Sequence, residues 1–421
     1  MEFGLLTWGW PPEPSGLAVA AREIALSAAA RGARVRVFTL DRPFGTVAVE
    51  DDVEILGCAP GPILRRLRRF AVVGHLAAPL AAWRAVRASH RRRPLDVLEA
   101  TNWYAPGVLV SRFGPVPLGT RHSTPAGTGA VPPSTLRDRV DLRFARFLER
   151  WSARGGAANI SNTAPHAAWM SALYGVPPPG PDHPVLGLSL PPVLLDHAAR
   201  APYPDHAVPV ELLFIGRNEP RKGTDALLAA IALLAGEAES GCSPPFRLHA
   251  VGLADHDLLA LSPAARSRII PLSRLSEPEK HALLERAHAV LAPSRYESFG
   301  LVYQEALAFG RPLLACAEDP SASASFGPNG TDPGAALLAA RCEPDCLATA
   351  IRRLLCEPGL RAELRTRALR AARRFDRATL GRGTLAAYAA FAVRPRAGSP
   401  AASAATGRGP SAKGADSAAS S

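Results

Sequence analysis

The sequence predicts two α/β domains, each built around a doubly wound parallel sheet, from its length and from two separate strand–turn–helix starts. The first start has an apolar strand, a Pro/Gly-rich loop, a helix and a second β-rich segment, at 3–8, 9–16, 17–30 and 35–39. The second has a strand, a charged turn and a helix, at 210–215, 216–223 and 224–234. Strands that alternate with helices form parallel sheets. The 421 residues, 47% of them apolar, exceed one ordinary core and supply enough apolar surface for two.

The same features place the domain boundaries. We expect an N-terminal domain over residues 1–180, a proline-rich linker over 181–209 and a C-terminal domain over 210–374. A terminal helix at about 375–392 is a candidate to pack back on the N-terminal domain. The final segment, 394–421, is rich in Ala, Ser, Gly and Pro and is predicted to be disordered.

The composition favours a cytoplasmic protein with an anionic partner. The net charge of +12 suits a phosphorylated substrate, an anionic lipid or nucleic acid, although an arginine-rich proteome explains it equally well. The six cysteines form no Cys-x-x-Cys pair, which favours reduced thiols. The N-terminus lacks the basic start of a signal peptide, and no apolar run reaches the length of a membrane span. No basic–aromatic interleaving or helix-turn-helix pattern is present, so nucleic acid is not an expected partner.

One N-terminal segment, Arg65–Arg93, is a candidate for peripheral contact with an anionic membrane. Four arginines precede and five follow an apolar stretch over 70–83. A basic, amphipathic segment of this kind can lie on a membrane surface. The alternative is an ordinary core helix with solvated arginines.

The strongest chemical signal is the segment 294–305, read as Ser-Arg-Tyr-Glu-Ser-Phe-Gly-Leu-Val-Tyr-Gln-Glu. It follows a predicted strand, and we expect Ser298 to cap a helix that begins at Leu301. The backbone N–H groups of Phe299, Gly300 and Leu301 would then be free at a helix start, which is a phosphate-binding arrangement. Gly300 has no side chain to obstruct the ligand.

Two carboxylates flank this helix start. Glu297 lies at the carboxyl end of the strand, where open α/β sheets bind ligands. Glu305 lies in the second turn of the helix, and its carboxylate suits two adjacent hydroxyls such as those of a ribose. The alternative for Glu297 is a surface carboxylate that the helix dipole stabilises.

The second signal is the charged turn between Gly216 and Gly223. It contains Arg217, Arg221 and Lys222, again at the carboxyl end of a strand, where two or three cations can neutralise a diphosphate leaving group. Lys222 is one of only three lysines in the chain, which favours a specific role. The alternative is a solvated loop.

Two weaker signals lie in the N-terminal domain. Gly16, after Ser15, directly precedes the first predicted helix and offers a second anion-binding start, although a glycine there can simply make a turn. His122 follows a short apolar stretch and could meet a substrate, although a lone histidine is more often structural.

Together these motifs resemble the retaining GT-B glycosyltransferases of family 4. The resemblance rests on Glu297–Glu305, on Gly216–Gly223 and on the Pro11–Gly16 start, and it covers about residues 1–392. It implies a GT-B fold: two facing Rossmann-like domains with an interdomain cleft that holds a nucleotide-sugar donor.

The resemblance also implies roles for individual residues. The residues with implied catalytic roles are Glu297, His122, Arg217 and Lys222. The implied donor-binding residues are Gly16, Arg217, Lys222, Glu297, Phe299, Gly300, Leu301 and Glu305. No cofactor and no metal are expected, because cations and helix termini stabilise the leaving phosphate.

The implied reaction moves a sugar, with retention of configuration, from a nucleotide-diphosphate sugar to a hydroxyl of a glycan or lipid-linked acceptor. One alternative is another GT-B enzyme, such as a sugar-nucleotide epimerase, which needs no acceptor, or a phosphorylase. A phosphorylase needs a lysine for pyridoxal phosphate, and Lys280 is interpreted as a surface helix residue. The other alternative is a non-catalytic protein that binds a nucleotide sugar.

Overall fold

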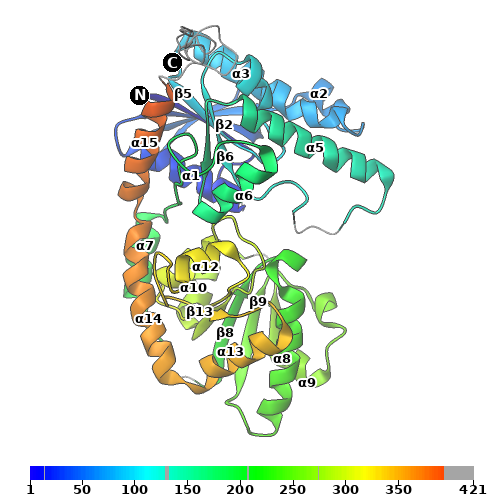
Figure 1. Cartoon of the computed structure of the whole chain (residues 1–421), viewed down its shortest axis with the longest axis vertical. Coiled ribbons are helices and arrows are strands. Elements are labelled where there is room, and N and C mark those ends of the chain that lie inside the picture. Colours follow the sequence, from blue (N-terminus) through cyan, green and yellow to red (C-terminus); the bar gives the residue numbers. More distant parts are fainter. Residues whose placement is uncertain (14, 129–131, 206–207, 274, 393–421) are drawn as a thin grey trace, which may run out of the picture.

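The computed structural model describes the chain except for residues 14, 129–131, 206–207, 274 and 393–421. The segment 394–421, predicted to be disordered, lies outside the described residues. Figure 1 shows two α/β bodies stacked along the long axis of the molecule, with the N-terminal one at the top. Each body surrounds its own sheet, which confirms the expected fold of two α/β domains.

The N-terminal domain is built on a seven-stranded sheet in the order β3-β4-β2-β1-β5-β6-β7. Neighbouring strands are parallel except β3 and β4, which pair antiparallel at one edge. The strands are β1 (Glu2–Thr7), β2 (Arg34–Pro43), β3 (Val47–Glu50), β4 (Val53–Ala59), β5 (Val97–Thr101), β6 (Leu118–His122) and β7 (Ala158–Ser161). The helices are α1 (Gly16–Ala29), α2 (Pro62–Leu67), η1 (Val73–Leu76), α3 (Ala77–Arg92), α4 (Val108–Phe113), α5 (Leu136–Gly155) and α6 (Ala164–Tyr174). Strand β1 is buried along its whole length, as expected for a central parallel strand.

The C-terminal domain is built on a six-stranded sheet in the order β10-β9-β8-β11-β12-β13, and all its neighbouring strands are parallel. The strands are β8 (Val210–Ile215), β9 (Phe246–Val251), β10 (Ile269–Leu272), β11 (Ala289–Leu291), β12 (Leu313–Cys316) and β13 (Leu337–Ala339). The longer helices are α8 (Thr224–Glu239), α10 (Glu277–Arg286), α11 (Leu301–Ala308), α13 (Pro344–Cys356) and α14 (Pro358–Ala372). Shorter turns are η2 (Pro220–Lys222), η3 (Asp255–Leu258), α9 (Pro263–Arg266) and α12 (Pro320–Phe326).

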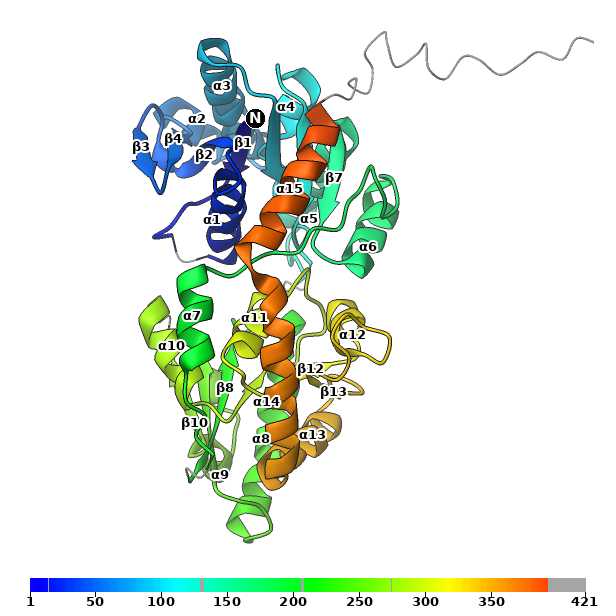
Figure 2. The same cartoon turned by 90° about the vertical axis from the view of Figure 1, so that its left-hand side faces the viewer.

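The chain crosses between the domains twice. The first crossing contains α7 (Pro192–Arg200), and the second runs from α14 through η4 (Arg373–Phe375) into α15 (Arg377–Ala392). Figure 2 shows α14 on the C-terminal domain and α15 continuing across the N-terminal one. The Tyr388 ring of α15 stacks on Phe3 of β1, with ring centroids 4.5 Å apart. Helix α15 is therefore part of the N-terminal core although it comes from the end of the chain.

The two sheets turn their carboxyl edges toward each other. Thr163, just after β7, has its hydroxyl 3.0 Å from the hydroxyl of Ser321, which follows β12. His166 of α6 hydrogen-bonds the hydroxyl of Tyr296, which follows β11. The Gln304 side chain of α11 donates to the Leu188 carbonyl of the linker at 3.0 Å. Open α/β sheets bind ligands at these edges, so the site expected from sequence lies between the domains.

The segment Arg65–Arg93 divides into two parts that differ in exposure. Helix α3 buries Ala78, Ala82 and Val86 in the core, so its apolar face is not available to a membrane, and here the core-helix alternative is correct. The part before it, from α2 to η1, leaves Phe70 and Val73 exposed. No helix in the described part of the chain is long and apolar enough to cross a membrane.

Candidate active site

Glu297 is the centre of a cluster of charges in the C-terminal domain. Its Oε1 lies 2.5 Å from Lys222 Nζ and accepts from the Ser294 hydroxyl at 2.8 Å, while Oε2 accepts from Arg221 Nη1 at 3.2 Å. The side chain is almost fully buried. Burial alone would raise the pKa of the Glu297 carboxyl, but Lys222 and Arg221 outweigh burial and lower it. Glu297 is therefore a buried carboxylate whose charge is matched by two cations.

Two loops at neighbouring strand ends bring these side chains together. The turn after β8 carries Lys222, and the loop after β11 carries Glu297. The Arg295 N–H donates to the Arg221 carbonyl at 2.9 Å and joins the loops. Gly223 has φ +68°, and a Cβ there would lie 2.1 Å from the Pro293 carbonyl oxygen. Only glycine allows this close approach, so the turn needs it.

The side chains of the two arginines in this turn lie in different places. The structure does not place Arg217 at Glu297: its side chain is 77% exposed and pairs with Glu219 at 2.9 Å. Arg221, which is only 9% exposed, contacts Glu297 instead. The sequence places Arg221 beside Lys222 in the turn, but only the fold decides which arginine points inward.

Glu305 forms a second ion pair that the sequence did not predict. Its Oε1 lies 2.7 Å from Lys280 Nζ, and Lys280 also pairs with Glu277 at 2.9 Å. The interpretation of Lys280 as a surface residue is wrong, since its side chain is only 15% exposed. Burial favours the neutral amine, but the two carboxylates outweigh burial and raise the pKa of Lys280.

The start of α11 differs from the expected capping. Ser298 is not its N-cap; Gly300 precedes the helix at φ +80°, and a Cβ there would meet the Tyr303 ring at 2.3 Å. Phe299 packs against the linker at Gly187, and Leu301 lies beside Gly16 at the start of α1. The structure thus brings Gly16 and the 299–301 segment together from different domains.

The structure buries the side chain of His122, for which the sequence predicted contact with a substrate. Its ring is fully buried at the end of β6, where Nε2 lies 2.9 Å from the Asn159 side-chain oxygen. Burial, with the nearby His183, lowers its pKa, so the ring is neutral near pH 7. A fully enclosed side chain cannot contact a ligand in this arrangement. His166 Nε2 lies 3.2 Å from the His122 carbonyl and His166 Nδ1 bonds Tyr296, so a relay of polar contacts leads from His122 toward Glu297.

Asp319 supports the Glu297 loop and was missed from sequence. Its carboxylate accepts from the Glu297 N–H at 2.9 Å and the Tyr303 hydroxyl at 3.0 Å, and it caps α12 through Ser321 and Ala322. Burial raises the pKa of Asp319 to about 6. The only sequence signal was the Asp-Pro start of a short helix, which is a general capping pattern.

The described residues contain no group of three or more His, Cys, Asp or Glu side chains that could hold a metal ion. The charged groups at the facing edges include Lys222, Arg221 and Glu297, with Lys280 of α10 and Glu305 of α11. Two facing parallel-sheet domains with cations and a helix start at their carboxyl edges define a GT-B glycosyltransferase.

The two halves of the chain match two sequence families. Residues 15–181 match the family described as "Glycosyl transferase 4-like domain", and residues 204–374 match "Glycosyl transferases group 1". The chain belongs to the family 4 glycosyltransferases of GT-B fold.

Individual relatives agree with this assignment. The chain is 27% identical to a D-inositol 3-phosphate glycosyltransferase from Kineococcus radiotolerans, over 89% of this chain and 90% of the relative. The fold matches a sucrose-phosphate synthase from Thermosynechococcus elongatus with a TM-score of 0.69 at 18% identity, over 92% of this chain and 98% of that one. It also matches an Anabaena protein, HepE, solved with UDP-glucose, with a TM-score of 0.60 at 18% identity, over 92% and 99% of the two chains.

Proposed function

We propose that this glycosyltransferase moves a sugar from a nucleotide-diphosphate donor to a hydroxyl of a glycan or lipid-linked acceptor, with retention of anomeric configuration. The observation that carries the proposal is the Lys222–Glu297 pair at 2.5 Å, at the carboxyl edge that faces the other domain. A cation and a carboxylate held together there match the needs of a diphosphate and of sugar hydroxyls.

The donor is held through its phosphates, its ribose and its sugar. Lys222 and the exposed Arg217 bind the diphosphate, together with the backbone N–H groups of Phe299, Gly300 and Leu301 at the start of α11. Glu305 binds the ribose hydroxyls and Glu297 contacts the transferred sugar. Gly16, in the N-terminal domain, leaves space for the donor on the other side of the site. Arg221 stays on Glu297 and keeps its carboxylate ionised.

Retention proceeds without a protein nucleophile. Glu297 is a poor nucleophile because Lys222, Arg221 and Ser294 all donate to it and its pKa is lowered. The acceptor oxygen therefore attacks the sugar from the same face from which the leaving group departs, and its proton passes to the leaving phosphate oxygen. Lys222 and Arg217 neutralise the charge that develops on this phosphate, so no metal is required.

A hydrolysis screen tests the donor half of the proposal. Purified protein is incubated with a panel of nucleotide sugars that includes UDP-glucose, and released nucleoside diphosphate is measured with and without EDTA. We expect one donor to be hydrolysed, with equal rates in EDTA. Lys222→Ala and Glu297→Ala should lose the activity, and Glu343→Ala, an exposed glutamate, should keep it. Full turnover by both site variants would contradict the proposal.

Two further measurements separate the alternatives. An epimerase converts the donor into a different sugar nucleotide without releasing nucleoside diphosphate, which chromatography distinguishes. The anomeric configuration of the transferred sugar, read from the proton coupling of the product, tests retention; an inverted product would contradict it.

The exposed part of the basic segment supports a peripheral membrane contact. Ile63, Phe70 and Val73 are exposed, and four arginines lie among them at 65, 66, 68 and 69. Apolar side chains beside cations suit an anionic lipid surface. Co-sedimentation with phosphatidylglycerol vesicles, but not phosphatidylcholine vesicles, is the expected result, and Ile63→Glu should abolish it.

A further inference from the structure

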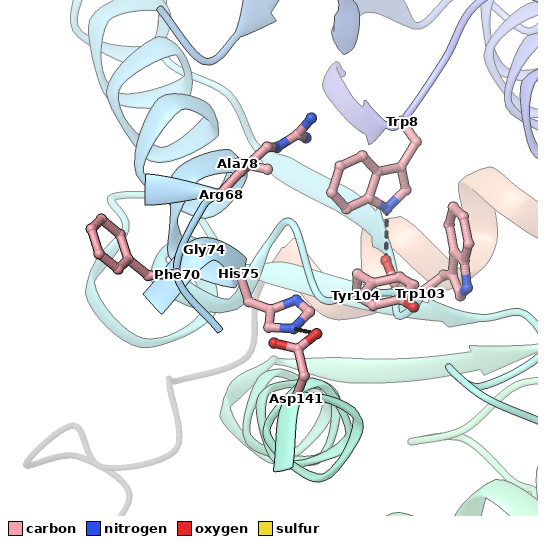
Figure 3. A pocket seen from close by; sticks show the side chains of 9 residues that line it. All are labelled: Trp8, Arg68, Phe70, Gly74, His75, Ala78, Trp103, Tyr104 and Asp141. Atoms are coloured by element: carbon pink, nitrogen blue, oxygen red, sulfur yellow. Dashed lines mark hydrogen bonds and ion pairs between the residues drawn. The ribbon is translucent and has the colours of Figure 1, made fainter. Parts of the chain in front are cut away.

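The N-terminal domain contains a cavity of about 360 Å³ that none of the charged site residues lines. One wall is aromatic and consists of Trp8, which follows β1, with Trp103 and Tyr104, which follow β5. The other wall contains His75 of η1 and Asp141 of α5 (Figure 3). The cavity thus lies at the carboxyl ends of two central strands, on the same edge of the sheet that faces the C-terminal domain.

The side chains of the aromatic wall contact one another. Trp8 donates its indole N–H to the Trp103 carbonyl at 2.6 Å. The rings of Trp8 and Trp103 meet edge to face at 6.0 Å, and those of Trp103 and Tyr104 do so at 5.0 Å. On its other side, Tyr104 stacks on His75 at 5.5 Å. Trp103 keeps 37% of its surface exposed, so part of this wall is open to a ligand.

Strained backbone surrounds the same cavity. Tyr104 and Ala105 have φ of +51° and +43°, and Val72 beside η1 has φ +64°, a conformation that a β-branched residue rarely adopts. Two carboxylates hold two of these positions: Asp141 accepts from the Val72 N–H and the buried Glu149 accepts from the Tyr104 N–H, both at 2.9 Å. Residues with strained backbone conformations are often found at ligand sites, where the surrounding structure holds them in place.

The residues that line the cavity include one arginine, Arg68. Asp141 already pairs with His75 at 2.9 Å and accepts from Val72. Arg68 lines the cavity and has no acidic partner among the described residues. Figure 3 shows its side chain reaching across the cavity toward Trp8, while Phe70 points away. A ligand with an apolar ring face and an anionic group would satisfy both the aromatic wall and Arg68.

We propose that this cavity binds the acceptor as an anionic carbohydrate, whose ring packs on the wall of Trp8, Trp103 and Tyr104 and whose phosphate or carboxylate pairs with Arg68. The inference rests on the glycosyl transfer proposed above and names the substrate class for it. Aromatic side chains offer a flat apolar surface to the C–H face of a sugar ring, and a few polar groups then fix its orientation. Arg68 supplies the planar guanidinium that suits phosphate and carboxylate.

Ligand-observed NMR titrations test the proposal with four probes: methyl α-glucopyranoside, glucose 6-phosphate, glucuronate and inorganic phosphate. We expect the two anionic sugars to bind the wild type more tightly than the neutral glycoside, and free phosphate to bind more weakly than either sugar acid. The two anionic sugars distinguish a phosphate from a carboxylate as the preferred group.

Two variants and one control assign the binding to the cavity. Trp103→Ala removes part of the aromatic wall but keeps the main-chain carbonyl that accepts from Trp8. It should weaken binding of every sugar by about fivefold or more. Arg68→Gln should bind the neutral glycoside as the wild type does but should lose the preference for anionic sugars. Phe44→Ala removes an exposed aromatic side chain outside the cavity and should change nothing.

Equal binding of neutral and anionic sugars by the wild type would overturn the proposal, as would absence of sugar binding or unchanged binding in Trp103→Ala. Donor hydrolysis is measured in the same preparations. If the wild type binds no sugar acid but hydrolyses its donor, the acceptor proposal fails alone. If no donor is hydrolysed, the proposed transfer fails first.

Discussion

Lys222 and Glu297 lie 75 residues apart in the chain, yet the ammonium of one is 2.5 Å from the carboxylate of the other. Arg221 donates to the second oxygen of the same carboxylate, and the Asp319 carboxylate accepts from the main-chain N–H of Glu297. The cluster is therefore supported on both sides before any ligand arrives. This preorganisation means that little rearrangement is needed when charge develops on a leaving phosphate.

Arg217 and Arg221 are expected to respond differently to replacement by alanine. Arg221→Ala removes a partner of the buried Glu297 and should lower the free energy of unfolding by ~1–3 kcal/mol. Arg217→Ala should leave stability unchanged, because its side chain is 77% exposed, but should reduce donor hydrolysis by about 100-fold. Chemical denaturation and kcat/KM for the donor measure the two effects. Equal destabilisation by both variants would contradict the assigned positions.

Glu305 is expected to govern donor affinity and not turnover. Glu305→Gln keeps the shape of the side chain but weakens its bond to ribose hydroxyls, so KM for the donor should rise by about tenfold with kcat little changed. Glu277→Gln is the matched control, because Glu277 shares Lys280 with Glu305 but has an exposed side chain. A fall in kcat with unchanged KM would place Glu305 at the reacting sugar instead.

Asp319 is expected to make stability depend on pH in an unusual direction. Its pKa rises from 3.8 to about 6 on folding, so between these values the folded chain binds more protons than the unfolded chain. Stability from this group is therefore present below about pH 4 and is lost as pH rises through about 6, by up to ~3 kcal/mol. The free energy of unfolding of the wild type, relative to that of Asp319→Asn, should therefore fall as the pH rises from 4 to 8. A pH-independent difference would show that Asp319 is ionised throughout.

Glu23 and Arg377 are expected to attach α15 to the N-terminal domain. The Glu23 carboxylate is 1% exposed, and Arg377 Nη2 lies 2.7 Å from it. Arg377→Ala leaves a buried carboxylate unpaired and should destabilise the protein by ~3–5 kcal/mol. The double variant Arg377→Ala/Glu23→Ala should regain much of the lost stability. Arg382→Ala, on the exposed side of the same helix, should have little effect on stability. Equal melting temperatures for Arg377→Ala and Arg382→Ala would exclude this attachment.

Local sequence was sufficient for the two sheets and for the position of the main loops. Strands β1 and β8 are short apolar runs followed by glycine-containing turns and helices, and such patterns depend on neighbours within about twenty residues. Capping was less predictable. Helix α11 begins at Leu301 as expected, but its N-cap is Gly300 in the left-handed conformation and not Ser298. The reason is steric, since the Tyr303 ring occupies the space that any side chain at 300 would need.

The choice of side chains at the site depended on contacts between distant segments. The turn after β8 offers three cations, and only its packing on the Pro293–Arg295 loop turns Arg221 inward and Arg217 outward. Lys280 likewise appeared to be a surface residue because nothing near it in sequence reveals that α10 lies over Glu305. His122 has a motif that suggests chemistry, yet the surrounding β6–β7 packing encloses it.

The sequence by itself determined the class of protein, because alternating strands and helices, the 294–305 segment and the cationic turn are local patterns. Only the tertiary structure decided which charges meet, since ion pairs such as Lys222–Glu297 and Lys280–Glu305 join separate strand ends and helices. It also decided that Trp8, Trp103 and Asp141 line one cavity. Side chains that far apart in the chain become neighbours only when the sheet aligns the ends of its strands on one edge.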